Sequence, residues 1–247
     1  ALELRGCALD VFCQTQTWHR PDAVIAAIEA LDWRHIAVAP HRRIRLAFGK
    51  RNRMKRPRFI AEQARHAKGP LGRFVAFVMA RETFAGNMRA IDALDVQPHD
   101  RVLDIGCGHG RSLGVLAARA TGGHVAGADP SALMTEIAVE RNRKLVKKGR
   151  IEVAIAGADH LPFADGTFDK ALCIHVTYFW KHLDAALQEI ARVMKPQGRL
   201  ALMFRTDADK AATRAFPANI YCFRSLAETV AALEAAGFAV DTKHDPA

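Results

Sequence analysis

One short stretch, from Arg101 to Leu113, most constrains what this chain can fold into. Its sequence, RVLDIGCGHGRSL, is an apolar run that breaks into three glycines at alternate positions and continues into a pattern suited to a helix. Glycine is used where the backbone must turn with a positive φ or where a ligand approaches closely. A helix that begins directly after such a turn points free N–H groups and the positive end of its dipole at the same place. The stretch therefore predicts a strand, a binding loop and a helix.

Strands and helices alternate from this point to the end of the chain. Apolar runs typical of buried parallel strands cover residues 101–105, 124–128, 151–156, 170–176, 199–204 and 238–242, and helices are predicted over 112–120, 132–148, 183–194 and 225–236. This pattern predicts an α/β fold with a doubly wound, mostly parallel sheet flanked by helices. Ligands of such sheets bind outside the carboxyl ends of the strands, so the segment after each strand is a candidate for the site.

Acidic residues follow the second and the third of these strands. Asp129 could accept hydrogen bonds from both hydroxyls of a ribose, or it could only cap the helix that begins near Ser131. Asp159 could accept from the exocyclic amine of a purine, with Leu161 and Phe163 offering apolar faces to the ring, or it could only stabilise a turn. Each acid alone is ambiguous, but together with the glycine loop they favour a nucleoside ligand.

The spacing of the glycines bears on which nucleoside this is. A dinucleotide-binding loop has the pattern G-x-G-x-x-G, whereas this loop is G-x-G-x-G and has Arg111 where the third glycine would stand. The pattern and the second acid at Asp159 argue against a nicotinamide-dependent oxidoreductase. That enzyme class is kept as an alternative.

These motifs together resemble the class I S-adenosylmethionine-dependent methyltransferases, over about residues 70 to 240. The resemblance rests on VLDIGCGHG at 102–110, GADP at 127–130, ADHLPFADGTFD at 158–169, EIARVMKPQGRL at 189–200 and AAGF at 235–238. It implies S-adenosylmethionine as the cofactor and methyl transfer to an N, O or C nucleophile. Within the family the chain most resembles enzymes that act on small-molecule or lipid-like acceptors.

The resemblance also implies a role for individual residues. The loop backbone would hold the methionine part of the donor, and Asp104 would brace the loop or the amino group. Asp129 would bind the ribose hydroxyls, and Asp159 would bind the adenine amine with the backbone of His160 beside it. The predicted donor-binding residues are Asp104, Gly106, Cys107, Gly108, Gly110, Asp129, Pro130, Ala158, Asp159, His160 and His175.

The segment after the fourth strand is where this family usually places the acceptor. His175 and Tyr178 are the candidate catalytic residues, because they could orient an acceptor or take its proton. Phe179 and Trp180 could form an apolar or cation–π wall. Packing of these aromatic residues against the next helix is the alternative, and proximity alone can drive much of a methyl transfer.

Two positions depart from the family pattern. Gln197 stands where a Lys-Pro-Gly-Gly turn usually has glycine. The family also adds a seventh, antiparallel strand after the strand at 238–242, whereas this sequence ends at Ala247. The seventh strand could therefore be missing from this sequence, and one edge of the sheet could be uncovered.

The front of the chain differs from the rest in charge. Of the net charge of +10, residues 1–70 carry +8, and nine basic residues with no acidic one lie between His41 and Phe59. We divide the chain into a basic extension at 1–58, a helical lid at 59–98 and the cofactor-binding domain at 99–247. The extension is expected to be partly disordered, and residues 1–53 could be foreign to the working protein because Met54 is a plausible start. In the lid, a helix predicted over 71–94 would cover the pocket with Phe84 and Asn87.

The basic run suits a solvated tail or a contact with phosphate-rich partners. Such a run can bind nucleic acid or an anionic membrane surface. A nucleic-acid methyltransferase or binding protein is therefore a second alternative, although aromatic residues are sparse in the run and no N-P-P-[YF] tetrad follows the fourth strand.

The cysteines and the hydropathy indicate a cytoplasmic protein. The five cysteines are scattered and lack C-x-x-C spacing, so we predict neither a disulfide framework nor a metal site. Nothing approaches the roughly 18 apolar residues of a membrane span, and the front shows no secretory signal. Free cysteines fit a reducing compartment.

Overall fold

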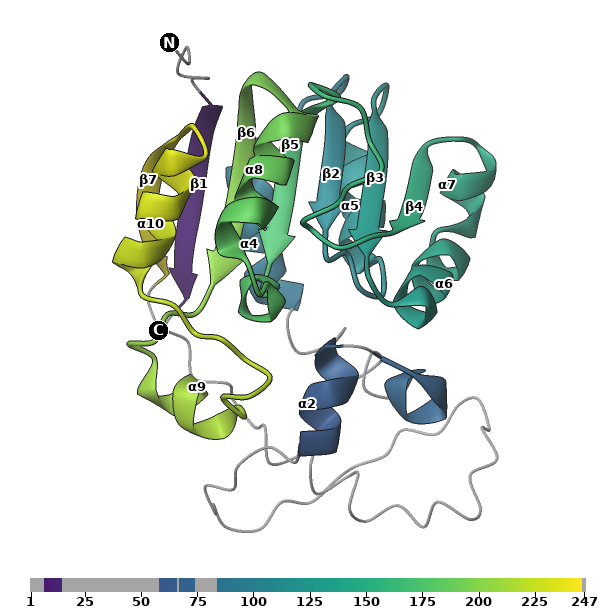
Figure 1. Ribbon diagram of the computed structural model, residues 1–247. Coiled ribbons are helices and arrows are strands. Elements are labelled where there is room, and N and C mark those ends of the chain that lie inside the picture. The colour runs from purple at the N-terminus through teal and green to yellow at the C-terminus, as the bar shows by residue number, and fades with distance from the viewer. Residues whose placement is uncertain (1–6, 15–57, 66, 74–83, 246–247) are drawn as a thin grey trace.

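The computed structural model describes residues 7–14, 58–65, 67–73 and 84–245, and its centre is a parallel sheet (Figure 1). Within these residues the sheet has seven strands in the order β4-β3-β2-β5-β6-β1-β7, and every neighbouring pair is parallel. The strands are β1 (Cys7–Gln14), β2 (Arg101–Ile105), β3 (His124–Asp129), β4 (Ile151–Ile155), β5 (Phe168–Ile174), β6 (Met194–Phe204) and β7 (Phe238–Asp245). The predicted doubly wound sheet is confirmed.

Helices cover both faces of the sheet, because successive strand residues point to opposite sides and both sides are apolar. Leu103 and Ile105 of β2 face a core that includes residues of α8 (Leu183–Val193) and α10 (Leu226–Ala235). Val102, which immediately precedes Leu103, faces a second core with residues of α4 (Phe84–Ala93) and α5 (Arg111–Arg119). Figure 1 shows α8 and α10 in front of the sheet and α4 and α5 behind it. The remaining helices are α2 (Arg58–Arg65), α6 (Ala132–Arg141), α7 (Arg143–Lys147), the 3-10 turn η1 (Thr177–Phe179) and α9 (Lys210–Ala215).

One long predicted helix is divided in two. The pattern predicts a helix over 132–148, but α6 ends at Arg141 and α7 begins at Arg143. The residue between them, Asn142, is buried and donates through Nδ2 to the carbonyl of Gly110 at 2.8 Å and to that of Ala138 at 2.9 Å. Apolar periodicity cannot reveal such a break, because a side chain bonded to a distant loop causes it.

Residues 7–14, which the division of the chain placed in the basic extension, belong to the sheet. They form β1 between β6 and β7, where Leu9 pairs with Leu200 on one side and with Val240 on the other. The sequence analysis left open whether a strand next to β7 is missing. In the structure β1, from the front of the chain, lies next to β7 and is parallel to it. A short apolar run such as CALDVFC does not by itself distinguish a buried strand from other structure. The basic run at 41–59 lies almost wholly outside the described residues, as does the first half of the helix predicted over 71–94.

Gln197, within β6, has an unusual backbone conformation. Gln197, at the position where the family usually has glycine, has a φ of 63°. That left-handed conformation is one that glycine adopts without a steric penalty and that most other residues disfavour. The departure from the family pattern therefore has a local cost in conformational energy.

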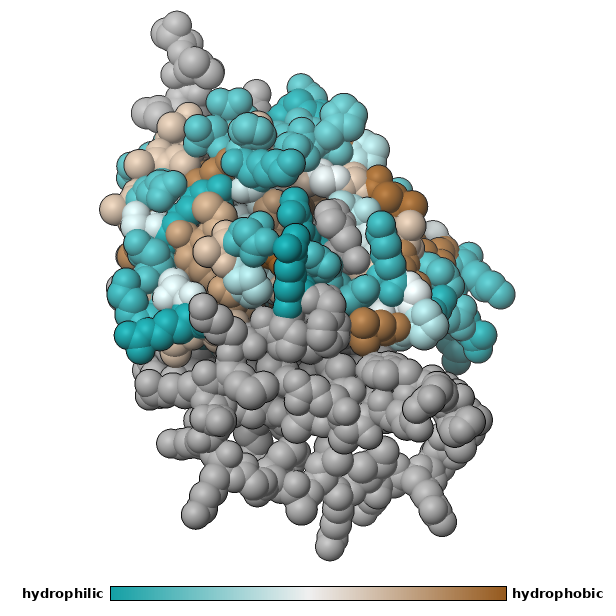
Figure 2. Space-filling model, turned by 60° about the horizontal axis from the view of Figure 1, so that its bottom comes forward, coloured by the Kyte–Doolittle hydropathy of each residue, from teal (hydrophilic) through white to brown (hydrophobic). Residues whose placement is uncertain are grey.

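The segment around α2 lies at the carboxyl ends of the strands, below the sheet in Figure 1. Ser131, at the start of α6, donates through Oγ to the carbonyl of Ala67 at 3.1 Å. Arg73 forms an ion pair with Glu136 at 2.5 Å, and Ala67 packs against Met134. These contacts fix the segment to α6. Figure 2 shows this end of the molecule, where the coloured residues are mostly hydrophilic.

Candidate functional site

The glycine loop after β2 is shaped by two tight contacts and one open position. Gly106, Gly108 and Gly110 all have positive φ, at 70°, 52° and 69°. A Cβ at Gly106 would lie 2.2 Å from Cγ1 of Val176, and one at Gly110 would lie 2.6 Å from Cβ of Ala138. At Gly108 a Cβ would meet nothing within 4 Å. Two of the glycines thus let the loop pack closely, and the third faces open space.

That open space is a cavity of about 350 Å³ at the carboxyl ends of β2 to β5. Nine of the eleven predicted donor-binding residues line it. The other two do not, since Gly110 packs against α6 and His160 donates its backbone N–H to the carbonyl of Gly157 at 3.3 Å. The lining residues from the predicted set are Asp104, Gly106, Cys107, Gly108, Asp129, Pro130, Ala158, Asp159 and His175.

Asp129 connects the loop with the start of α6. Its Oδ2 accepts from the backbone N–H of Gly108 at 3.0 Å, and its Oδ1 accepts from the N–H of Ser131 at 2.9 Å. The cap of α6 is Ser131 itself, whose Oγ accepts from the N–H of Met134 at 3.4 Å. A carboxylate offers about four acceptor positions, so these two bonds are compatible with a ligand hydroxyl on the same group.

Asp104 carries a buried oxygen that has no partner within the described part of the chain. The residue is 3% exposed, and its Oδ2 makes no hydrogen bond. Burial and the nearby charge of Asp129 raise the pKa of Asp104 to about 7. Because a buried acceptor without a partner is unfavourable, this oxygen suits a cationic or N–H donor group of a ligand in the cavity.

The loop after β4 is held from outside by α8. Arg192 donates to the carbonyls of Leu161 at 3.1 Å and Phe163 at 2.9 Å, and it pairs with Glu189 at 2.7 Å. The loop places Asp159 in the cavity wall. The predicted apolar partners lie elsewhere: Leu161 is in the core, and Phe163 packs edge-on against another aromatic ring with the two ring centres 5.0 Å apart. The sequence reading did not identify Arg192, whose five donors suit a loop with several exposed carbonyls.

The two candidate catalytic residues are joined, but only one of them faces the cavity. His175 lines it and has a φ of 56°, with its N–H bonded to the carbonyl of Met203 at 2.8 Å. Its Nδ1 lies 3.0 Å from the hydroxyl of Tyr178, which in turn accepts from the backbone N–H of Arg205 at 2.6 Å. Tyr178 is buried and outside the lining. Arg205 is fixed by a buried ion pair with Asp209 at 2.6 Å.

Electrostatics separate these two residues further. Burial, together with the charge of Arg205, lowers the pKa of His175 to about 3, so the imidazole is neutral near pH 7. Burial raises the pKa of the Tyr178 hydroxyl above its usual range. Neither group is well suited to take a proton near neutral pH. The arrangement instead suits an imidazole that orients a ligand and a tyrosine that holds the imidazole.

The rest of the lining combines apolar and basic side chains. Phe179 and Trp180 line it and also pack against the main core, and Asn87 of α4 lines it as well. Arg65, Lys181 and His182 also line the cavity and were not identified from the sequence, because no motif marks them. Within the described residues there is no cluster of three or more His, Cys, Asp or Glu side chains that could hold a metal ion.

Comparison with known proteins agrees with this geometry. Residues 103–202 match a family described as a methyltransferase domain. Together with the relatives described below, this match supports a class I S-adenosylmethionine-dependent methyltransferase. The comparisons give no support to a nicotinamide-dependent oxidoreductase.

Two curated relatives illustrate the similarity. A methyltransferase of Streptomyces halstedii, GfsG, is 40% identical over 111 residues, which is 45% of this chain and 40% of that protein. The ubiquinone/menaquinone biosynthesis C-methyltransferase UbiE of Haemophilus ducreyi is 36% identical over 118 residues, 46% of this chain and 44% of that protein. The match thus spans less than half the length of either relative.

A solved structure extends the comparison to three dimensions. The S-adenosylmethionine-dependent methyltransferase of Aquifex aeolicus aligns with a TM-score of 0.52 and 26% identity, over 61% of this chain and 78% of that one. No described helix of the present chain is long and apolar enough to cross a membrane.

Proposed function

We propose that this protein transfers a methyl group from S-adenosylmethionine to an N, O or C nucleophile of a small-molecule or lipid-like acceptor. The observation that carries the proposal is a single cavity lined by the glycine loop and by Asp104, Asp129 and Asp159. The loop and Asp104 would hold the methionine part, Asp129 the ribose and Asp159 the adenine. The bound donor would supply an electrophilic methyl group on its sulfonium.

The acceptor end is assigned from the apolar part of the cavity lining. Ile174, Val176, Phe179 and Trp180 give that part its apolar character. A quinone-like or other partly apolar molecule suits such a surface, and one relative is named as an enzyme of ubiquinone and menaquinone biosynthesis. We propose that His175 touches the acceptor as a neutral imidazole and orients it, and that Tyr178 is a positioning residue.

Replacing Asp129 tests the proposed donor site. Asp129→Ala should weaken binding of S-adenosylmethionine at least tenfold in calorimetry, because it removes both the ribose acceptor and the bond that fixes the N–H of Gly108. Asp207→Ala, which changes an exposed acid outside the cavity, should bind as the wild type does. Equal binding by wild type and Asp129→Ala, or no binding by wild type, would refute the assignment.

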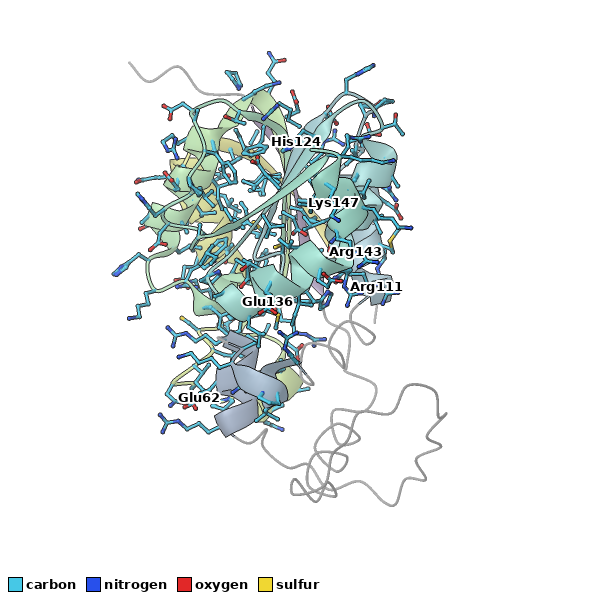
Figure 3. All side chains as sticks on the ribbon, turned by 90° about the vertical axis from the view of Figure 1, so that its right-hand side faces the viewer. Glu62, Arg111, His124, Glu136, Arg143 and Lys147 are labelled. Carbon is cyan, nitrogen blue, oxygen red and sulfur yellow. The ribbon has the colours of Figure 1, made fainter. Side chains whose placement is uncertain are left out.

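A contact with nucleic acid or an anionic membrane through residues 41–59 stays a proposal. Among the described residues, Arg111, Arg143 and Lys147 lie along one side of the molecule, where Glu136 also lies (Figure 3). Arg141 is close enough to Arg111 that burial and this like charge lower its pKa. Retention on RNA or on anionic vesicles that falls steeply with salt would support the contact. Binding that does not change when residues 41–58 are deleted would exclude this run.

A further inference from the structure

Asn87 brings a second buried oxygen without a partner to the same cavity. Within the described residues, the buried side-chain oxygens that lack a hydrogen bond are Oδ1 of Asn87 and Oδ2 of Asp104. Both residues line the cavity, although one comes from α4 and the other from the middle of the sheet. Two such oxygens at one cavity point to a ligand that supplies the missing donors.

The position of Asn87 is fixed by the helix that carries it. On the same helix, Ala90 and Ile91 are fully buried in the core behind the sheet, and Leu94 just beyond its end is buried there as well. A side chain on a packed helix cannot readily move to find another partner. This amide oxygen has no partner among the described residues, so a ligand donor that reaches it gains a hydrogen bond.

The donor groups of the proposed cofactor can be assigned one by one. The ribose hydroxyls are matched by Asp129 and the adenine amine by Asp159. The remaining donor is the α-ammonium, a cation with three N–H groups that requires oxygen acceptors. Oδ2 of Asp104 is one such acceptor, and its negative charge suits a cation, but a single oxygen leaves two N–H groups to be matched.

We propose that Oδ1 of Asn87 and Oδ2 of Asp104 together accept hydrogen bonds from the α-ammonium of S-adenosylmethionine. The inference rests on the proposed function and adds a donor-binding residue that no motif marks. Asn87 thereby makes α4 part of the donor site, next to the methionine end. Because the product S-adenosylhomocysteine has the same ammonium group, it should use the same two oxygens.

The test compares two ligands that differ only at this group. Calorimetry would measure S-adenosylhomocysteine and its analogue without the α-amino group against wild type, Asn87→Ala and Asn87→Asp. Asn87→Ala should weaken binding of S-adenosylhomocysteine on the order of tenfold and leave binding of the analogue unchanged, because a hydrogen bond to a charged group is lost only in the first case. Asn87→Asp keeps an acceptor and should retain the affinity at pH 8.

The outcomes separate this inference from the proposed function. If Asn87→Ala weakens both ligands equally, Asn87 acts on the fold and the inference fails. Loss of binding in Asn87→Asp would mean that the amide N–H₂ is the important group, which also overturns it. If wild type binds neither S-adenosylmethionine nor S-adenosylhomocysteine, the proposed function itself fails.

Thermal unfolding without ligand provides a readout that does not depend on the cofactor. Asn87→Ala should leave the melting temperature unchanged or raise it, because it removes a buried oxygen without a partner. Asn142→Ala is the matched control, since the Asn142 side chain donates to two carbonyls and its loss should lower the melting temperature. A comparable drop in both variants would contradict the assignment.

Discussion

Lowering the pH from 8 to 6 should weaken the binding of S-adenosylmethionine about tenfold. Burial and the charge of Asp129 raise the pKa of Asp104 to about 7, so the ionised fraction falls from about nine-tenths at pH 8 to about one-tenth at pH 6. Only the ionised carboxylate attracts the α-ammonium. Calorimetric titration across this range in buffers of matched ionic strength would measure the effect.

The buried thiols and imidazoles at this end of the sheet do not change charge in this range. The thiols of Cys107 and Cys173 are buried, and burial raises the pKa of each well above its usual value, so both stay protonated. The pKa of His109 is lowered to about 4 and that of His175 to about 3, in both cases mainly by burial. Both imidazoles therefore stay neutral between pH 6 and 8.

Asp104→Asn is the matched control for this prediction. The amide has nearly the shape of the carboxyl group but does not ionise, so its binding should be weak at pH 8 and should not change down to pH 6. Wild-type affinity that is flat across the range would show that Asp104 is already ionised throughout or does not meet the ammonium.

The same ionisation should appear in stability. The unfolded chain loses this proton near pH 4 and the folded protein only near pH 7, so the folded state binds more protons between these values. The stability contributed by the protonated group is thus present below about pH 4 and is lost as the pH rises through 7. Since the ligand ammonium offsets the charge, the increase in melting temperature caused by S-adenosylmethionine should be larger at pH 8 than at pH 6.

Local rules were enough to predict six of the seven described strands and several residues of the cavity wall. A buried parallel strand, a glycine turn and the acid at its tip each leave a signature over a few residues, which is why Gly106, Asp104 and Asp129 could be named from the sequence. The order of the strands then brings their tips to one edge. Features that depend on distant partners were not accessible in this way. The break at Asn142 depends on the carbonyl of Gly110, and the unmatched oxygen of Asn87 depends on what surrounds it.

The catalytic candidates show the same limit. The spacing of His175 and Tyr178 suggested two equivalent groups at the tip of the fourth strand. Their difference arises from the backbone N–H of Arg205, which lies 27 positions after Tyr178 and holds the tyrosine hydroxyl outside the cavity lining. The Tyr178 hydroxyl and Nδ1 of His175 lie 3.0 Å apart and share one hydrogen bond, whose donor is set by the tautomer of the imidazole. The pair is therefore one oriented hydrogen-bonding unit.

Removing this unit should affect turnover and stability in different ways. At saturating donor, His175→Ala should lower kcat on the order of 100-fold, because an acceptor held about 1 Å out of line reacts that much more slowly. His175→Gln keeps a side-chain N–H and should recover part of the loss. Formation of S-adenosylhomocysteine in the presence of a host metabolite extract, followed by mass spectrometry, would measure turnover.

Tyr178→Phe should lower the free energy of unfolding by about 1–3 kcal/mol, because the buried N–H of Arg205 loses its acceptor.

The ionisation of the imidazole decides between orientation and proton transfer. With its pKa lowered to about 3 by burial and by Arg205, the ring of His175 should show no change in nitrogen-15 chemical shift between pH 8 and pH 5. Its signals can be assigned by their absence in His175→Gln. At saturating donor, kcat should likewise show no loss from protonation of His175 across this range. An imidazole that titrates near pH 6.5, with kcat falling as it gains the proton, would instead identify His175 as a general base.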